Sequence, residues 1–182
     1  MSLELPRFWL PPRCGNRNIL LSARNFGITL LELLLVVAIF SLLMAIAVPM
    51  YTRQVDKAKV ARAIGEIGEI QLKVDKYDLN NRAVPLTLAE AGVGNMRDPW
   101  GNPYQYLSLR NCDDDKCLNP DNETVKARRD GNLKPINSYF DLYSMGKDGE
   151  SRQSLTANES QDDIVRALDG AFIGLASEYS PK

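Results

Sequence analysis

The stretch "GITLLELLLVVAIFSLLMAIAVPMY", from Gly27 to Tyr51, decides the fold of this 182-residue chain. It is the most apolar part of the sequence, and yet it holds a carboxylate, Glu32. Residues 33–50 carry no charge, and their length is close to the roughly 20 apolar residues with which a helix spans a bilayer. A carboxylate at the edge of such a segment costs free energy unless it is paired, so Glu32 indicates a function beyond anchoring.

The residues around this segment allow three interpretations of it. Four arginines and one glutamate precede Ile28, which is typical of membrane insertion with the basic side in the cytoplasm. A plain membrane anchor and a secretory signal cleaved at "AIA" (Ala45–Ala47) both fit this pattern, but they leave Glu32 without a role. The third interpretation is a segment that is cut after Gly27 and then gives Glu32 a partner. The first residue of the mature protein distinguishes them, since an anchor keeps Met1, a secretory signal leaves Val48 and cleavage after Gly27 leaves Ile28.

The motif "GITLLE" resembles the cleavage and methylation motif of type IV pilins and type II secretion pseudopilins. The resemblance implies that a prepilin peptidase removes residues 1–27 as a leader by cutting after Gly27, and that the new N-terminal residue, Ile28, is methylated. It also implies that Glu32 pairs with the α-amino group of a neighbouring subunit, which would mainly fix the axial register of the two helices. Pro49 lies where these families also place a proline, and we expect it to kink or locally open the helix because it lacks a backbone donor.

Helical periodicity continues beyond the apolar segment. One stripe with helical spacing consists of Val60, Ile64, Ile67, Val74 and Tyr77, with Ile70 close to it. The sequence therefore predicts one helix over residues 28–79, with an apolar transmembrane or filament-core half (28–51) and an amphipathic half (52–79). A second stripe consists of the small residues Ala58, Ala61, Gly65 and Gly68. These small residues indicate close packing, either on the protein's own sheet or on a neighbouring subunit's helix.

Residues 80–182 are predicted to form a globular α+β head. "NNRAVP" (Asn80–Pro85) ends the helix, and "TLAE" (Thr87–Glu90) is a capping-box pattern that predicts a short helix. Alternation in "YQYLSL" and in "SYFDLYSM" (Ser138–Met145) predicts two strands. The stretch Asn111–Asn137 is rich in charged residues, Asn and Pro, and is predicted to be a long surface loop. Its "KARRDGNLK" is either solvated or a basic contact patch, and the final "DGAFIGLASEYSPK" predicts a strand or a helix.

Cys112 and Cys117 bracket "DDDK" within that long stretch. The chain has three cysteines and no histidine, so it lacks the four ligands of an ordinary zinc site. Three neighbouring aspartates disfavour a reactive thiolate, and a local structural disulfide is therefore predicted. The same lack of histidine argues against the usual nucleophilic triads and against an enzyme. A net charge of −1 gives no reason to expect a nucleic-acid partner.

Three segments of the head, "DPWGNPYQYL", "FDLYSMGKDG" and "DDI", resemble in this order the major pseudopilins of type II secretion. The resemblance implies a type IV pilin-like fold, in which a long N-terminal helix packs on a small antiparallel sheet. It also implies a calcium-binding C-terminal loop, with Asp148 and Asp163 as side-chain ligands and the Met145 carbonyl as a backbone ligand. The segment between the two acids is longer than is usual in the family, so Asp162 or Glu159 could replace Asp163, or the site could be lost. From composition alone, the alternative is a solvated acidic loop.

The resemblance implies a structural subunit. It predicts a homo-oligomeric helical filament, the periplasmic pseudopilus, which assembles with other pseudopilins and inner-membrane components to drive type II secretion across the outer membrane. Before assembly, the subunit would span the inner membrane once and hold its head in the periplasm. One alternative is a subunit of a surface type IV pilus for adhesion, motility or DNA uptake. Another is a membrane-anchored domain in which Asp148 and Asp163 hold a catalytic metal.

Overall fold

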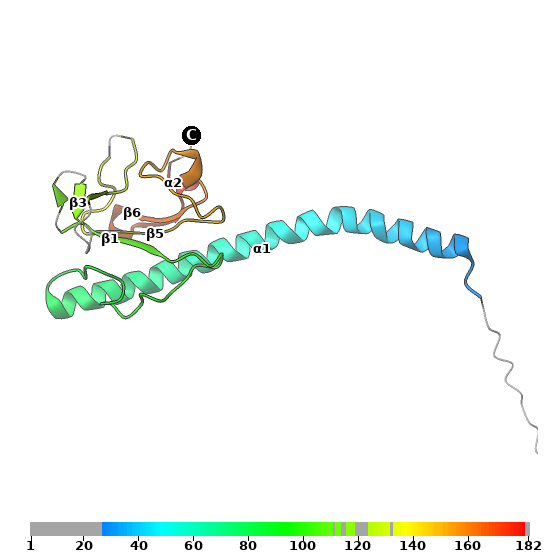
Figure 1. Cartoon of the computed structure of the whole chain (residues 1–182), viewed down its shortest axis with the longest axis horizontal. Coiled ribbons are helices and arrows are strands. Elements are labelled where there is room, and N and C mark those ends of the chain that lie inside the picture. Colours follow the sequence, from blue (N-terminus) through cyan, green and yellow to red (C-terminus); the bar gives the residue numbers. More distant parts are fainter. Residues whose placement is uncertain (1–26, 111, 114–115, 119–123, 132, 181–182) are drawn as a thin grey trace, which may run out of the picture. The chain divides into compact units, whose positions relative to one another are not determined.

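A computed structural model of the chain describes residues 27–110, 112–113, 116–118, 124–131 and 133–180. Its first element is the helix α1, Leu30–Asn81 (Figure 1). The chain divides into two compact units between Met44 and Ala45, and α1 has residues in both. The sequence predicted this helix over residues 28–79, so both predicted ends lie two residues from the observed ones. The apolar part of α1 is long enough to cross a membrane, and its side chains are exposed, as at Leu30 and Leu42.

A four-stranded antiparallel sheet forms the centre of the head. Its strands follow the order β1-β5-β6-β7, and their bounds are Gln105–Ser108, Phe140–Ser144, Ile164–Ala167 and Phe172–Leu175. Two short 3₁₀ helices, η1 (Asn158–Ser160) and η2 (Leu168–Gly170), and the final helix α2 (Ala176–Tyr179) complete this part of the chain. This arrangement confirms the predicted α+β, type IV pilin-like fold.

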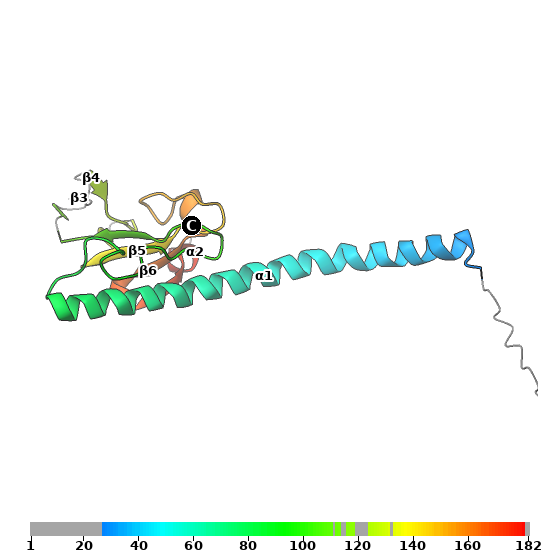
Figure 2. The same ribbon diagram turned by 60° about the horizontal axis from the view of Figure 1, so that its bottom comes forward.

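The main core lies between this sheet and the part of α1 that belongs to the same unit (Figures 1 and 2). Ile67, Ile70 and Val74 are fully buried on α1, and they pack with Phe140 and Ile164 of the sheet. Burying each of these large apolar side chains stabilises the fold by about 1.5–3 kcal/mol. The predicted apolar stripe is thus confirmed at its centre. At its ends, Val60, Ile64 and Tyr77 are only partly buried.

Two parts of the head differ from the prediction. "TLAE" (Thr87–Glu90) forms turns instead of a short helix, although the Glu90 N–H still donates to Thr87 Oγ1 at 3.4 Å. Gly92 follows with a φ of 76° and reverses the chain before a helical turn can propagate. The C-terminal stretch, for which a strand and a helix were alternatives, forms both, β7 and then α2.

The stretch Asn111–Asn137 is not simply a surface loop, which corrects the prediction. It contains a second antiparallel sheet with the order β2-β3-β4, whose bounds are Cys112–Asp113, Lys116–Leu118 and Thr124–Lys126. Beyond β4, Ala127 and Arg128 are buried, as are Ile136 and Asn137. Ile136 packs with Leu155 and Val165 in a second apolar cluster, so this stretch adds to the core instead of lying over it.

Candidate functional site

The first turn of α1 brings Glu32 close to the residues predicted to be processed. Gly27, Ile28 and Thr29 precede the helix, and the side chain of Ile28 is 75% exposed. The Glu32 N–H donates to Thr29 Oγ1 at 3.1 Å, so Thr29 caps the helix. This capping role was not predicted from the sequence, although "TLLE" has the same capping-box pattern as "TLAE". Cleavage after Gly27, methylation of Ile28 and intersubunit pairing of Glu32 stay predictions.

Pro49 lies inside α1, which continues through it without interruption. The Thr52 hydroxyl donates to the Pro49 carbonyl oxygen at 3.1 Å, one turn further along. The helix is thus not interrupted at Pro49, and the expected kink there stays a prediction. A role for Pro49 in assembly stays a prediction.

The stripe of small residues does not pack on the protein's own sheet. Ala58, Ala61 and Gly65 are exposed, and a Cβ atom built on Gly65 or Gly68 would have no neighbouring atom within 4 Å. The sheet instead contacts the face of α1 that carries Ile67. Packing on the protein's own sheet is therefore wrong as an explanation of the stripe, and contact with another helix is the alternative that is left.

The turn "DPWGNP" closes around a buried carboxylate. Asp98 is 4% exposed, and its Oδ1 accepts the N–H groups of Trp100 at 3.0 Å and Asn102 at 2.8 Å. Its Oδ2 accepts the hydroxyl of Ser144 at 2.6 Å, at the end of β5. The Asn102 amide donates in turn to the Gly146 carbonyl oxygen at 3.2 Å. Asp98 thus ties this turn to the first residues of the segment 145–163, which is called the C-terminal loop below.

Two of the predicted calcium ligands lie in the C-terminal loop and bond to its backbone. Asp162 Oδ2 accepts the N–H groups of Lys147 at 2.8 Å and Asp148 at 3.1 Å. Asp148 Oδ1 accepts the N–H of Glu150 at 2.8 Å. Gly146 makes the close approach of Asp162 possible, since it has a φ of 66° and a Cβ there would lie 2.5 Å from the Asp162 carbonyl oxygen.

Asp163, the predicted partner of Asp148, faces an arginine instead. It is fully buried, and its Oδ2 accepts Arg128 Nη2 at 2.5 Å and the Ser151 hydroxyl at 2.6 Å. Burial raises the pKa of Asp163 to about 6, although Arg128 and Ser151 act in the opposite direction. The carboxylate is therefore mostly ionised at neutral pH, which keeps the ion pair with Arg128 intact.

The residues predicted to bind calcium make other contacts in the structure. Among the described residues, no three acidic or cysteine side chains converge in a way that could hold a metal. Glu159, the other candidate, pairs with Arg152 at 3.4 Å, and Met145 lies directly after β5. Calcium binding itself stays a prediction, but one carboxylate oxygen each of Asp148, Asp162 and Asp163 already accepts hydrogen bonds from backbone N–H groups or from an arginine.

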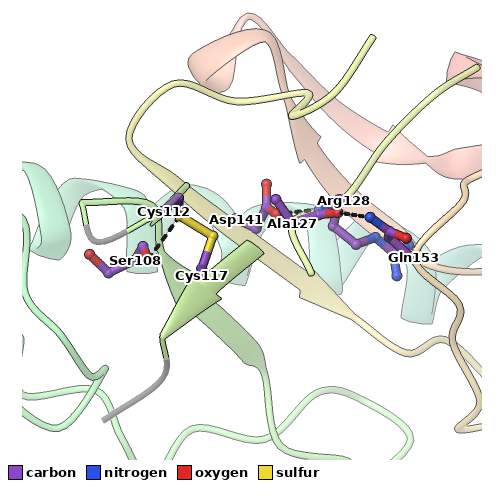
Figure 3. Close-up of a disulfide and its surroundings, with 7 residues drawn as sticks. All are labelled: Ser108, Cys112, Cys117, Ala127, Arg128, Asp141 and Gln153. Carbon is purple, nitrogen blue, oxygen red and sulfur yellow. Dashed lines mark hydrogen bonds between the residues drawn. A yellow bond between two sulfur atoms is a disulfide. The ribbon is translucent and has the colours of Figure 1, made fainter. Parts of the chain in front are cut away.

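The predicted disulfide between Cys112 and Cys117 is present and joins β2 to β3 (Figure 3). Cys117 is fully buried, and it packs with Leu107, Leu109 and Ala127 in a third apolar cluster. The disulfide therefore holds β2 and β3 together, and the packing of Cys117 attaches this small sheet to the head.

Comparison with known proteins identifies the same family. Residues 22–48 match the prokaryotic N-terminal methylation motif. The type II secretion system core protein G of Pseudomonas aeruginosa is 34% identical over 145 residues, which cover 68% of this chain and 84% of that protein. The protein of the same name from Aeromonas hydrophila is 31% identical over 108 residues, covering 47% of this chain and 74% of that protein.

A fimbrial protein of Neisseria meningitidis is 34% identical over 85 residues, which cover 47% of this chain and 50% of that protein. No solved structure matches the chain. The match to the Pseudomonas protein extends through most of that protein's length, whereas the fimbrial match reaches only half. Together with the capped apolar helix and the antiparallel head, these similarities show that the chain belongs to the type II secretion system core protein G family, the major pseudopilins.

Proposed function

We propose that this chain polymerises into a periplasmic pseudopilus that serves type II secretion. The observation that carries the proposal is the bare surface of α1. Its large apolar side chains from Leu30 to Tyr51 are exposed, which a folded protein tolerates only when lipid or other protein surfaces cover them. A membrane covers them before assembly, and the helices of neighbouring subunits cover them in the filament.

The orientation and the partners follow from the same features. The arginines that precede Ile28 favour a cytoplasmic N-terminal side, and the Cys112–Cys117 disulfide is typical of an oxidising compartment such as the periplasm. The partners are then the prepilin peptidase, other pseudopilins and inner-membrane secretion components. In this role the subunit is structural, because its contribution is a packing surface and not a reaction.

Deleting the gene for this chain in its host tests the function. We expect exported folded proteins to accumulate in the periplasm and to fall in the medium, with both restored by the wild-type gene. The measurement compares a secreted enzyme activity in the two fractions, and a periplasmic marker enzyme controls for leakage. Unchanged secretion together with lost surface filaments, adhesion or DNA uptake would contradict the proposal and favour the type IV pilus.

Replacing Gly65 with leucine tests the contact between helices. A Cβ atom at Gly65 would have no neighbour within 4 Å apart from the helix's own backbone, so we expect an unchanged melting temperature (Tm) of the head and a reduced yield of filaments. Filament yield is measured by electron microscopy and by cross-linking of the overproduced protein. Gly65→Ala is the matched control, since it adds one methyl group and raises helix propensity. Normal filament yield from Gly65→Leu would place the contact on another face of α1.

A further inference from the structure

The side chain of a buried arginine from outside the C-terminal loop is surrounded by residues of that loop. Arg128 is only 4% exposed, and its Nη1 donates to the Arg152 carbonyl oxygen at 2.7 Å and to the Ser151 hydroxyl. Its Nη2 donates to Asp163 Oδ2 at 2.5 Å. The guanidinium also lies over the ring of Tyr143, 4.2 Å from the ring centroid. One side chain from outside the loop therefore joins the middle of the loop to its end.

The groups that surround this guanidinium are oxygens of the types that calcium prefers. They are a carboxylate, a backbone carbonyl and a hydroxyl, from Asp163, Arg152 and Ser151. A positive charge at their centre stabilises them as a metal ion would, because it offsets the repulsion between oxygens that a buried loop brings together. Arginine suits this position, since its planar guanidinium presents several N–H donors in fixed directions.

The backbone around Arg128 is held so that the side chain can reach the loop (Figure 3). The Arg128 N–H donates to Asp141 Oδ2 at 2.6 Å, and Gln153 Nε2 donates to the Ala127 carbonyl oxygen at 2.9 Å. The Arg129 N–H donates to the Gln153 carbonyl oxygen at 3.0 Å, so the segment is fixed to β5 on one side and to the C-terminal loop on the other. Arg128 is therefore a fixed part of the head and not a mobile surface side chain.

We propose that Arg128 is a built-in cation that orders the C-terminal loop in place of calcium, so that the loop is stable without the metal. A calcium ion on Asp163 would lie next to the guanidinium, and the two positive charges would repel each other in a buried site. Asp163 Oδ1 is buried and has no hydrogen-bond partner in the described part of the chain, but one oxygen falls well short of the six to eight that calcium takes. The proposal is independent of the filament function.

The experiment compares the full-length chain in detergent with added calcium and with a calcium chelator. We expect the same Tm in both conditions, the same rate of amide hydrogen exchange in residues 145–163, and no heat of calcium binding in titration calorimetry. We expect Arg128→Met to lower the Tm by at least about 5 °C and to speed amide exchange in the loop, because the variant leaves Asp163 buried without its cation. Arg129→Met is the matched control, since it removes the same charge from an exposed neighbouring side chain and should change neither value.

Arg128→Lys covers the case in which Arg128→Met does not fold. It keeps the charge but loses the forked donors, so we expect a smaller fall in Tm with faster exchange limited to the loop. Two results would overturn the proposal. One is a calcium-dependent rise in the Tm of the wild-type chain that the chelator reverses. The other is an Arg128→Lys or Arg128→Met variant that is as stable and as protected as Arg129→Met.

Discussion

Glu32→Ala is expected to abolish filament assembly and to leave the head folded. The side chain lies in the exposed first turn of α1, four residues after the one that becomes the N-terminus in the proposed processing. In an apolar filament core, the variant would leave the α-amino group of a neighbouring subunit without its counter-charge. Breaking a buried pair in this way costs about 3–5 kcal/mol for each contact, and the filament repeats that contact at every subunit.

The measurement is filament yield by electron microscopy, with the Tm of the head as the check on folding. Glu69→Ala is the matched control, because it removes an exposed carboxylate from the amphipathic half of the same helix. Thr29→Ala separates the two roles of the first turn, since it removes the cap at a cost of about 1 kcal/mol and keeps the carboxylate. Normal filaments from Glu32→Ala would contradict the pairing between subunits and would limit the carboxylate to stabilising the N-terminus of its own helix.

Asp98→Ala is expected to destabilise the head by about 2–4 kcal/mol. The variant leaves two N–H groups, of Trp100 and Asn102, and the Ser144 hydroxyl without their acceptor. Each unsatisfied buried polar group costs about 1–3 kcal/mol, and local rearrangement recovers part of the sum. The effect should extend to the C-terminal loop, because the Gly146 N–H near the start of that loop donates to the same Ser144 hydroxyl.

Urea unfolding of the full-length chain in detergent, followed by tryptophan fluorescence, measures this loss. Asp98→Asn is the control. It keeps Oδ1 as an acceptor for the two N–H groups and offers an amide donor to Ser144, so we expect a much smaller change. Equal stability of the alanine and asparagine variants would mean that solvent replaces the hydrogen bonds of Asp98.

The sequence predicted those elements whose signal is local and periodic. The spacing from Val60 to Tyr77 predicted α1, and alternation predicted strands at β1 and β5. The sequence contained no sign of β6. All four residues of Ile164–Ala167 are buried, so polar and apolar side chains do not alternate along this strand. Arginine is usually a surface residue, yet Arg166 in that strand is 3% exposed and donates to the carbonyl oxygen of Phe140.

The site was predictable where a short motif carries it and not where distant segments meet. The two disulfide cysteines follow from a local pattern, whereas the roles of Gly27 and Glu32, read from an equally local motif, stay predictions. The partner of Asp163 does not, since Arg128 lies 35 positions earlier in a stretch whose composition is that of a solvated loop. Residue-by-residue matching to a family assigned Asp163 to a metal because it compares only the residues that the family shares. An arginine from a segment outside the matched motifs is invisible to such a comparison.

The cap at Thr29 has a consequence for the proposed cleavage after Gly27. Because α1 begins at Leu30, the bond between Gly27 and Ile28 lies in non-helical chain. Proteolytic enzymes generally need their substrate backbone extended, and a bond within a helix must first unwind. If the proposed processing occurs, the bond to be cut lies in exposed, non-helical chain, so its hydrolysis would require no unwinding of α1. The Thr29 hydroxyl thus caps a helix that begins only two residues after the bond that the proposed processing would cut.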